Sequence, residues 1–567
     1  MAKDYKALAE VYEDLESTTK KLKKRDIIAD FIKKLPSEQL QRVVLLVMGR
    51  VFPAWSDKEI GIANKLMIKA ISKATGANLK DVKKEFKKKG DLGTTAEELI
   101  KGKKQRTLSS KKNTIKHVFE TIQKIAEQEG KGSQEKKLDL IAGLLSNAKP
   151  KEARYIVRTV LDELRIGVAE GIVRDAIAKA FDVKPKAVED AYHLNPDYGE
   201  IAKTVKKKGK KGLKKVSIEP GTPIKALLAE KAPDLKTALK KYENPILEWK
   251  YDGMRALIHK KGKKIWIFTR RLENVSNAFP DLVKLSKKNI KAKDCIIDGE
   301  VLGIDGETGR PVPFQKLSTR IKRKYDIKKA AKEIPIQFNA FDILYLNGNC
   351  LFDKALKKRR KILKKKIKTK KDKFQLTKFL ITKDLKKAEE FYKDALSAGQ
   401  EGIIVKNLDA AYQPGRRVAG GWLKVKPVME TLDLAIIGAT WGIGKRTGWL
   451  GSFKLGCREA TTGKFLACGM LGTGIKEKKT KKEDVTFKEL TKMLEPYVEE
   501  TKGKKVIIKP KIIIEVAYEE IQKSPKYKSG YALRFPRFMR LRPDKAPKDA
   551  DTKARIKKLY KQQKGKK

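Results

Sequence analysis

The spacing of apolar residues changes near residue 200, and this change constrains the possible fold more than any other feature of the chain. Before it, apolar residues recur at intervals of three and four, as helices require. Residues 153–181 carry two such stripes separated by Gly167 and Gly171, which predicts two helices. After it, short alternating segments bounded by turn residues predict strands interleaved with helices. We therefore expect a helical part followed by mixed α and β structure.

The length of 567 residues suffices for several domains of ordinary size. Residues 205–216 are rich in Lys and Gly, so we expect a basic linker there. Residues 430–567 contain five short apolar strands and one helix, which is typical of a small β-barrel of the oligonucleotide-binding type, the OB-fold. The predicted fold class is thus multidomain α and α+β, with a helical domain over 1–204, an α+β domain over 217–429, and an OB-fold domain over 430–567 that ends in a basic C-terminal tail.

Basic residues dominate the composition, with 133 Lys and Arg against 70 Asp and Glu and a formal net charge of +63. This surplus favours polyanionic partners, with nucleic acid or an anionic membrane surface first. No apolar run is long enough to span a membrane and no signal peptide is present, so we expect a soluble, intracellular protein. Because lysine is spread from end to end, a non-catalytic chromatin or scaffold protein is an alternative.

The four cysteines, at positions 295, 350, 457 and 468, include no C-x-x-C pair. Zinc sites and disulfide frameworks depend on clustered or regularly spaced cysteines. We therefore expect free thiols and no structural zinc.

Charged residues stand at the edges of apolar strands in five places along the second part of the chain. The first is E-W-K-Y-D-G-M-R, in which an Asp-Gly turn presents Lys250 at a rim. The others are D-G-E ending at Glu300, F-D-I-L-Y beginning at Phe341, E-G-I-I-V-K beginning at Glu401, and W-L-K-V-K containing Lys424 and Lys426. Each alone is more often a strand end with a solvated charge, and K-x-D-G alone is more often a plain hairpin. Chance does not explain all five in this order.

In these motifs the chain resembles the ATP-dependent DNA ligases of the archaeal and eukaryotic replicative type, within the lysine-dependent nucleotidyltransferases. The helical sequence A-R-Y-I-V-R-T-V-L-D-E-L-R-I-G-V-A-E-G-I-V-R-D-A-I, residues 153–177, resembles the DNA-binding domain of the same family. The resemblance covers nearly the whole chain. It implies an enzyme that uses ATP to seal nicks in double-stranded DNA during replication, repair and recombination, through a lysyl-AMP intermediate and a DNA-adenylate.

The resemblance also implies the cofactors, the partners and the cellular location of the enzyme. ATP and Mg²⁺, or another divalent cation, are the expected cofactors, and nicked double-stranded DNA is the expected partner, gripped by three domains. We expect a monomer without membrane association, in the cytoplasm or at the nucleoid, with a sliding clamp as a further candidate partner.

Roles for individual residues follow from the resemblance alone. It implies that Lys250 becomes adenylylated, Glu248 reads the adenine amino group, Arg255 lies beside the nucleotide, Glu300 contacts the ribose and Phe341 stacks on the adenine. Further nucleotide contacts are implied for Arg270, Arg417, Lys424 and Lys426.

Three further groups of residues are implied outside this set. Arg271 would share the nick phosphate with its neighbour Arg270, and Gly167 and Gly171 would let helix amino-termini approach DNA phosphates. Arg542 and Lys545, in R-P-D-K, would orient the pyrophosphate of ATP in the first step. The alternatives are simple helix packing for the glycines and a basic barrel edge on the DNA backbone for Arg542 and Lys545.

The chemistry explains why these residue types are needed. A lysine that attacks the α-phosphate must be neutral, although its unperturbed pKa is about 10.4. Positive charge from Arg255, Lys424, Lys426 and a bound Mg²⁺ would favour the neutral amine and stabilise the phosphoryl oxygens. Because Mg²⁺ takes oxygen ligands, Glu401 and Glu300 are the candidate metal ligands.

Other lysine nucleotidyltransferases are weaker alternatives. An mRNA-capping guanylyltransferase or an RNA ligase would not need about 200 helical residues ahead of the catalytic domain. An NAD-dependent DNA ligase usually carries a zinc-binding cysteine cluster, which this sequence lacks. Whether NAD, ADP or GTP also serves as donor is left open by the sequence.

Overall fold

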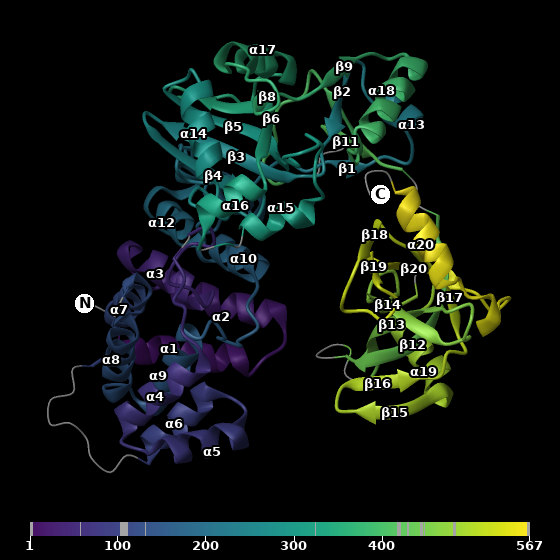
Figure 1. Cartoon of the computed structure of the whole chain (residues 1–567). Coiled ribbons are helices and arrows are strands. Elements are labelled where there is room, and N and C mark those ends of the chain that lie inside the picture. The colour runs from purple at the N-terminus through teal and green to yellow at the C-terminus, as the bar shows by residue number, and fades with distance from the viewer. Residues whose placement is uncertain are drawn as a thin grey trace. The chain divides into compact units, whose positions relative to one another are not determined.

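The computed structural model describes residues 4–56, 58–102, 112–130, 132–321, 323, 325–416, 421–427, 430–442, 446, 448–479 and 484–563. The chain divides into two compact units, residues 1–388 with 404–424 and residues 389–403 with 425–567. Helices make up the N-terminal part, and the first strand among the described residues begins at Glu230 (Figure 1). Each helix of the described residues is too short or too polar to cross a lipid bilayer.

Helices packed on one apolar core form the N-terminal part. They are α1 (Tyr5–Glu16), α2 (Lys21–Lys33), α3 (Ser37–Val47), α4 (Asn64–Thr75), α5 (Leu79–Lys89), α6 (Leu92–Lys101), α7 (Ile115–Glu127), α8 (Ser133–Ser146), α9 (Pro150–Val160), α10 (Glu170–Ala180), α11 (Pro185–Leu194) and α12 (Tyr198–Lys214). The predicted break after α9 is confirmed, and Gly167 lies in it with φ +63°, a conformation that favours glycine. Gly171 lies inside the first turn of α10.

The basic segment 205–216 is helical over most of its length. It lies mainly in α12, which continues to Lys214 across a kink at Gly209. Val205 and Leu213 are buried in the core of the helical part. The composition, which predicts a basic linker, does not indicate this helix, because two apolar residues anchor a segment that is otherwise polar.

Two β-sheets form the middle part of the chain. The five-stranded sheet has the order β1-β11-β10-β2-β9, and the six-stranded sheet has the order β4-β3-β5-β6-β7 with β8 beside β6. The strands are β1 (Glu230–Lys231), β2 (Pro245–Lys250), β3 (Met254–Lys261), β4 (Lys264–Thr269), β5 (Asp294–Gly303), β6 (Ile336–Leu346), β7 (Asn349–Cys350), β8 (Phe374–Leu376), β9 (Phe379–Ile381), β10 (Gly402–Asn407) and β11 (Trp422–Val425). The helices are α13 (Leu235–Lys240), α14 (Pro280–Asn289), α15 (Phe314–Ile321), α16 (Ile327–Glu333), α17 (Leu356–Lys366) and α18 (Leu385–Ser397).

The six-stranded sheet is buried on both faces by two different cores. One core packs Phe338 of β6 with Phe279, Leu282 and Leu363 from the helical side. The other core contains side chains of both sheets, among them Leu257 of β3, Phe341 of β6 and Trp422 of β11. The strands therefore read as nearly continuous apolar runs, as expected for a sheet covered on both faces.

The C-terminal part is rich in strands, as predicted for the OB-fold domain. Its elements are β12 (Leu432–Trp441), β13 (Leu450–Arg458), β14 (Phe465–Leu471), α19 (Phe487–Leu494), β15 (Val498–Lys502), β16 (Lys505–Ile508), β17 (Ile513–Ala517), β18 (Glu520–Lys523), β19 (Tyr531–Arg534), β20 (Arg537–Leu541) and α20 (Lys553–Gln562). The main sheet has the order β14-β13-β12-β16-β15, with β17 joining β12 to β20.

The sequence underestimated the number of strands in this part. The hairpin of β15 and β16 was missed because β15, V-E-E-T-K, is largely exposed and shows no apolar alternation. The last residues of the predicted basic tail, 564–567, lie outside the described residues. Otherwise the predicted fold class, helical followed by α+β and a strand-rich domain, is confirmed.

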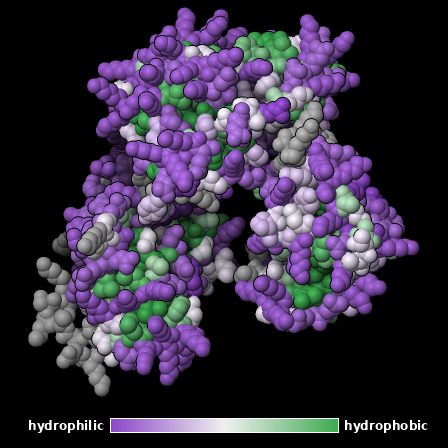
Figure 2. All heavy atoms as spheres, viewed as in Figure 1, coloured by the Kyte–Doolittle hydropathy of each residue, from purple (hydrophilic) through white to green (hydrophobic). Residues whose placement is uncertain are grey.

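Hydrophilic residues cover most of the face seen in Figure 2, with apolar residues visible in smaller patches. The prediction of free thiols is confirmed, since none of the four cysteines is in a disulfide. Cys295, Cys457 and Cys468 are buried, and Cys350 is exposed.

Candidate active site

Lys250 lies where the chain passes from one sheet of the middle part to the other. It ends β2 of the five-stranded sheet, and β3, which starts at Met254, belongs to the six-stranded sheet. The turn between them passes close to β5, because a Cβ at Gly253 would lie 2.3 Å from the carbonyl oxygen of Val301. The K-x-D-G segment is therefore a connection between sheets that needs its glycine, and the plain-hairpin alternative does not hold.

Glu248 lies two residues before Lys250 and is almost completely buried. Its side chain is 2% exposed, and its two carboxylate oxygens form separate ion pairs. Oε1 pairs with Arg360 of α17, and Oε2 pairs with Lys406 of β10. Burying a carboxylate is costly unless it is paired, and these two cations meet that requirement.

Two aromatic rings lie beside this ion pair and carry cations over their faces. Phe341 and Trp422 meet edge to face, with ring centroids 5.6 Å apart. The Nζ of Lys406 lies 4.2 Å from the centroid of Phe341 and 3.9 Å from that of Trp422. Burial lowers the pKa of Lys406, although Glu248 opposes this shift. Phe341 and Trp422 are both buried, and aromatic rings that attract cations also have flat apolar faces suited to stacking on a heterocyclic base.

Arg255 of β3 is fixed by a second buried carboxylate. Its Nε and Nη2 atoms donate to the two oxygens of Asp298 at 3.0 and 2.6 Å. Its guanidinium carbon lies 5.5 Å from the ring centroid of Phe341. Although burial alone would lower it, Asp298 raises the pKa of Arg255 well above its ordinary value, so this side chain stays charged. The hydroxyl of Tyr412 also donates to Asp298, at 3.2 Å.

The remaining predicted residues of the middle part fall into two groups. Glu300 pairs in register with Arg255 across β3 and β5, and its Cγ would lie 3.1 Å from a Cβ at Gly253, beside the Lys250 turn. Lys424 lies on β11 and pairs in register with Lys231 of β1. By contrast, Lys426 forms an ion pair with Glu401, and both belong to the second compact unit.

The predicted arginines of this part lie in loops after strands or outside the described residues. Arg270 and Arg271 directly follow β4 and are exposed. Arg417 lies outside the described residues, and its neighbour Arg416 forms an ion pair with Asp190 of α11.

Arg542 and Lys545, the predicted residues of the C-terminal part, share a carboxylate. Arg542 donates to both oxygens of Asp433 at 2.9 Å, and Lys545 donates to Oδ2 of Asp433 at 2.6 Å. Arg542 also donates to Asp544 at 2.7 Å. Both cations are thus held in one cluster at the start of β12.

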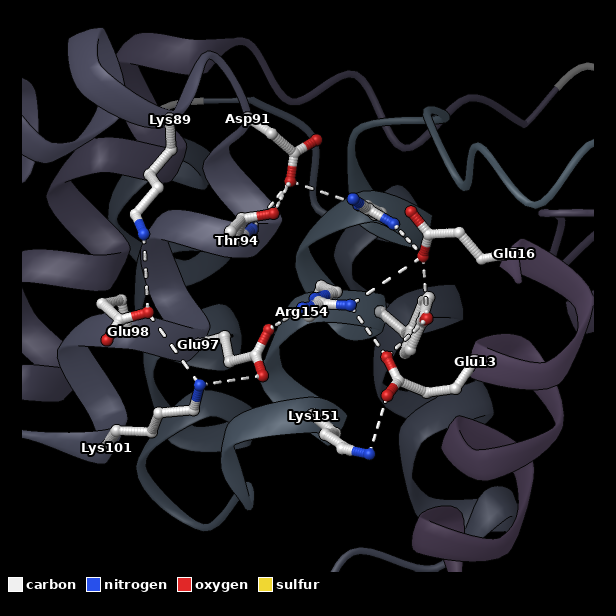
Figure 3. A network of polar contacts seen from close by, with 12 residues as sticks. Glu13, Glu16, Lys89, Asp91, Thr94, Glu97, Glu98, Lys101, Lys151 and Arg154 are labelled. Carbon is white, nitrogen blue, oxygen red and sulfur yellow. Dashed lines mark hydrogen bonds and ion pairs between the residues drawn. The ribbon is translucent and has the colours of Figure 1, made fainter.

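The helical part contains the predicted glycines and a separate network of charges. A Cβ at Gly167 would lie 2.8 Å from Nζ of Lys24, whereas Gly171 has open space where a Cβ would point. Figure 3 shows the network, which joins α1, α6 and α9. Arg154 pairs with Glu13 at 2.8 Å and with Glu97, and Arg158 pairs with Asp91 at 3.2 Å.

Several buried polar residues around Glu248 and Arg255 had no predicted role. They are Asp298, Arg359, Arg360, Lys406 and Tyr412. Arg359 is 1% exposed and donates to Asp342 through Nε at 2.8 Å and Nη2 at 2.9 Å. A signal was present in the sequence: the two arginines interrupt a run of lysines in α17, and arginine is the residue suited to bidentate carboxylate pairing.

The predicted carboxylate ligand, Glu401, fits a divalent cation that is held by few protein groups. Among the described residues no group of three or more His, Cys, Asp and Glu side chains could hold a metal ion. Mg²⁺ is usually held by one or two carboxylates together with phosphates and water, so such a cluster is not required. Glu401 has this chemistry, and its pairing with Lys426 shows that it accepts a cation.

A lysine at the junction of two sheets, two residues from a buried carboxylate with paired cations and aromatic rings beside it, is compatible with a nucleotide-binding transferase that uses a covalent lysine. Comparisons with known proteins define the family. "ATP dependent DNA ligase domain" matches residues 226–426, "DNA ligase N terminus" matches 4–178, and "ATP dependent DNA ligase C terminal region" matches 446–545. The chain belongs to the ATP-dependent DNA ligase family.

Named relatives match almost the whole chain. The DNA ligase of Nanoarchaeum equitans is 50% identical over 563 residues, which is 99% of each chain. The DNA ligase of Thermococcus onnurineus is 46% identical over 98% of this chain and 97% of its own. A solved structure titled "Pmar-Lig_Pre." shares the fold with a TM-score of 0.54 and 16% identity, and covers 94% of this chain and 99% of that one.

Membership of the family defines the reaction. The enzyme uses ATP to seal nicks in DNA through a covalent lysyl-AMP intermediate, and it requires a divalent cation. The functional prediction from the sequence is therefore confirmed at this level, whereas the roles of single residues are taken up below.

Proposed function

We propose that Lys250 is the nucleophile that takes AMP from ATP. The observation that carries this proposal is its position at the junction of the two sheets, two residues from the buried Glu248. Arg255 and Lys406 place positive charge beside Phe341, the proposed base-stacking ring, and this charge would oppose charge build-up on phosphoryl oxygens. The Nζ of Lys250 attacks the α-phosphorus, the bond to the bridging oxygen breaks, and pyrophosphate leaves.

The other pocket residues bind and orient the nucleotide in this proposal. Phe341 stacks on the adenine, Glu248 accepts a hydrogen bond from its amino group, and Glu300 contacts the ribose. Further cationic contacts to the phosphates come from Arg255, Arg270, Arg417, Lys424 and Lys426. Glu401, with Glu300, would hold Mg²⁺, which supplies charge neutralisation at the phosphate oxygens when it is bound.

The later steps use DNA. AMP passes from Lys250 to the 5′-phosphate at the nick, and the 3′-hydroxyl then displaces AMP to form the phosphodiester bond. We propose that Gly167, Gly171 and Arg271 contact the DNA backbone, and that Arg542 and Lys545 act only on the pyrophosphate of ATP in the first step. The net charge of +63 supports sequence-independent, salt-sensitive binding of nicked duplex DNA.

We also propose the oligomeric state, the cellular role and the domain boundaries. We infer a monomer that acts in DNA replication, repair and recombination at the nucleoid, with a sliding clamp as an additional partner. The domain boundaries we propose are 1–204, 217–429 and 430–567, with residues 205–216 as the connecting segment.

The test uses ATP labelled on its α-phosphate, a divalent cation and a denaturing gel. The wild-type chain should retain label, Lys250→Ala should retain none, and nicked DNA should release the label. Lys263→Ala, an exposed lysine of the β3–β4 turn, is the matched control and should label normally. Label retained by Lys250→Ala would overturn the proposal, and label from GTP or NAD in place of ATP would change the donor.

A further inference from the structure

Arg360 makes contacts to two of the residues proposed to bind the base. Its Nη1 pairs with Oε1 of Glu248 and donates to the backbone oxygen of Phe341 at 3.4 Å. Its guanidinium carbon lies 4.6 Å from the ring centroid of Phe379, on strand β9. The side chain is 13% exposed, so one guanidinium is held in place from three directions.

The second cation on Glu248 is placed differently. Lys406 lies over the rings of Phe341 and Trp422, at 4.2 and 3.9 Å. A base that stacks on Phe341 competes with this ammonium group for space beside the ring. Arg360 instead contacts the main chain of Phe341, so its hold on Glu248 is compatible with a stacked base.

The state of Glu248 determines which base it can accept. An ionised carboxylate accepts hydrogen bonds and cannot donate them. Adenine presents an amino group at its 6-position, which donates, whereas guanine presents an oxygen there, which only accepts. A carboxylate fixed at this position therefore attracts adenine and repels guanine. With its side chain only 2% exposed, Glu248 needs a partner that fixes its orientation and is not displaced by the base.

We propose that Arg360 is the positioning residue that orients the Glu248 carboxylate, and so makes the enzyme select adenine over guanine. This inference rests on the proposed function, because it takes Glu248 and Phe341 as base-binding residues. It predicts that Arg360 acts through Glu248 and takes no part in the chemistry at Lys250.

The test compares Arg360→Met with Lys361→Met, an exposed neighbour on α17, in self-adenylylation of the full chain. For Arg360→Met we expect the KM for ATP to rise about tenfold while kcat stays within about twofold, since a charged hydrogen-bond network is lost without change at the nucleophile. The ratio of kcat/KM for ATP to that for GTP should fall about tenfold. Arg360→Lys should restore part of this ratio, and Lys361→Met should change neither value.

A double-mutant cycle with Glu248→Gln separates positioning from a general structural effect. If Arg360 acts through Glu248, the double variant should be no worse than Glu248→Gln alone. An unchanged ATP-to-GTP ratio in Arg360→Met, or fully additive losses, would overturn the inference. If Arg360→Met does not fold, Arg360→Lys takes its place, and an unchanged ratio there has the same meaning.

The same assays keep this inference apart from the proposed function. If Lys250→Ala still becomes labelled, the proposed function fails. If Lys250 is essential but Arg360 variants keep the base preference, only the role of Arg360 fails.

Discussion

Two clusters of buried charge, one in the helical part and one in the middle part, differ in how many carboxylates their cations meet. In the helical cluster of Figure 3, Arg154 pairs with Glu13, Glu16 and Glu97, and Arg158 pairs with Glu16 and Asp91. In the middle part, by contrast, Arg360 and Lys406 share the single carboxylate of Glu248.

The difference teaches how to separate structural charge from functional charge. A cation whose neighbours are carboxylates at short distance is neutralised where it stands, and its role is to join helices. A glycine supports this in the helical cluster, because a Cβ at Gly93 would lie 2.6 Å from the backbone oxygen of Arg154 and would force α6 from α9. Two cations that share one carboxylate leave positive charge for an anionic ligand.

The C-terminal cluster provides the sharpest test of this comparison, because Arg542 is paired with carboxylates and yet has a proposed catalytic role. Arg542→Ala should slow self-adenylylation about 10²–10³-fold, since it would remove charge stabilisation of the leaving pyrophosphate. Sealing of a nick that already carries AMP should be retained. Single-turnover assays of the two steps measure this.

Arg540→Ala, an exposed arginine paired with Glu515, is the matched control and should leave both steps within about twofold. If Arg542→Ala weakens only DNA binding, the cluster is structural or DNA-facing. Cations paired with several carboxylates would then have no catalytic role in either cluster.

Breaking the helical cluster should affect stability and leave the first step intact. Arg158 and Asp91 are 7% and 9% exposed, so Arg158→Met removes one of the two arginines that pair with this buried carboxylate and leaves Arg165. The loss should be about 2–3 kcal/mol, below the usual range for a broken buried pair because Asp91 still accepts from Thr94 N–H. Hydrogen exchange of α6 and α9 amides measures it.

Lys101→Ala is the control for this change, because the lysine is 52% exposed and should cost no more than about 0.5 kcal/mol. Slower self-adenylylation by folded Arg158→Met would contradict the structural interpretation of the cluster.

His259 offers a contrast to both clusters, because burial itself lowers its pKa to about 3. The folded domain keeps His259 neutral, whereas the unfolded chain binds a proton below about pH 6.5. Folding stability should therefore fall as pH drops below 6.5, by up to about 2 kcal/mol between pH 6.5 and 5. His259→Gln, which keeps an acceptor for Gly221 N–H, should remove this share of the pH dependence.

The measurement is hydrogen exchange of β3 and β5 amides, with wild type and variant compared at the same pH. Equal pH dependence of the two proteins would show that another group is responsible.

The smallest expected effect concerns Phe341, the ring beside the Glu248 ion pairs. Phe341→Leu keeps an apolar side chain but loses the flat face, so the KM for ATP should rise about two- to tenfold. Initial rates of self-adenylylation against ATP concentration give this value. A matched change on the other core of the same sheet, Phe374→Leu, should leave KM unchanged in the folded protein.

Much of the chemistry could be predicted from the sequence because it resides in short contiguous motifs. The motifs predict Lys250, Glu248, Arg255, Glu300 and Phe341 as site residues, and the structure brings Glu248, Arg255 and Phe341 into one cluster. The helix break at Gly167 was also predicted, because apolar spacing and glycine are local signals.

Other features could not be predicted because they depend on residues distant in sequence. Arg360 lies 112 positions from Glu248, and no local pattern indicates that they pair. The helical state of the segment 205–216 could not be predicted for a related reason, since it depends on Leu213 meeting a core formed by other helices.

What the sequence determined by itself was the set of motifs that identify the family and the order of helical and strand-rich parts. Both are encoded locally, in side-chain chemistry and in apolar periodicity. The tertiary structure alone decided that the K-x-D-G turn joins two sheets, and which partner each buried charge receives. The physical reason is that a buried charge must be paired, and its partner is set by how the sheets and helices pack.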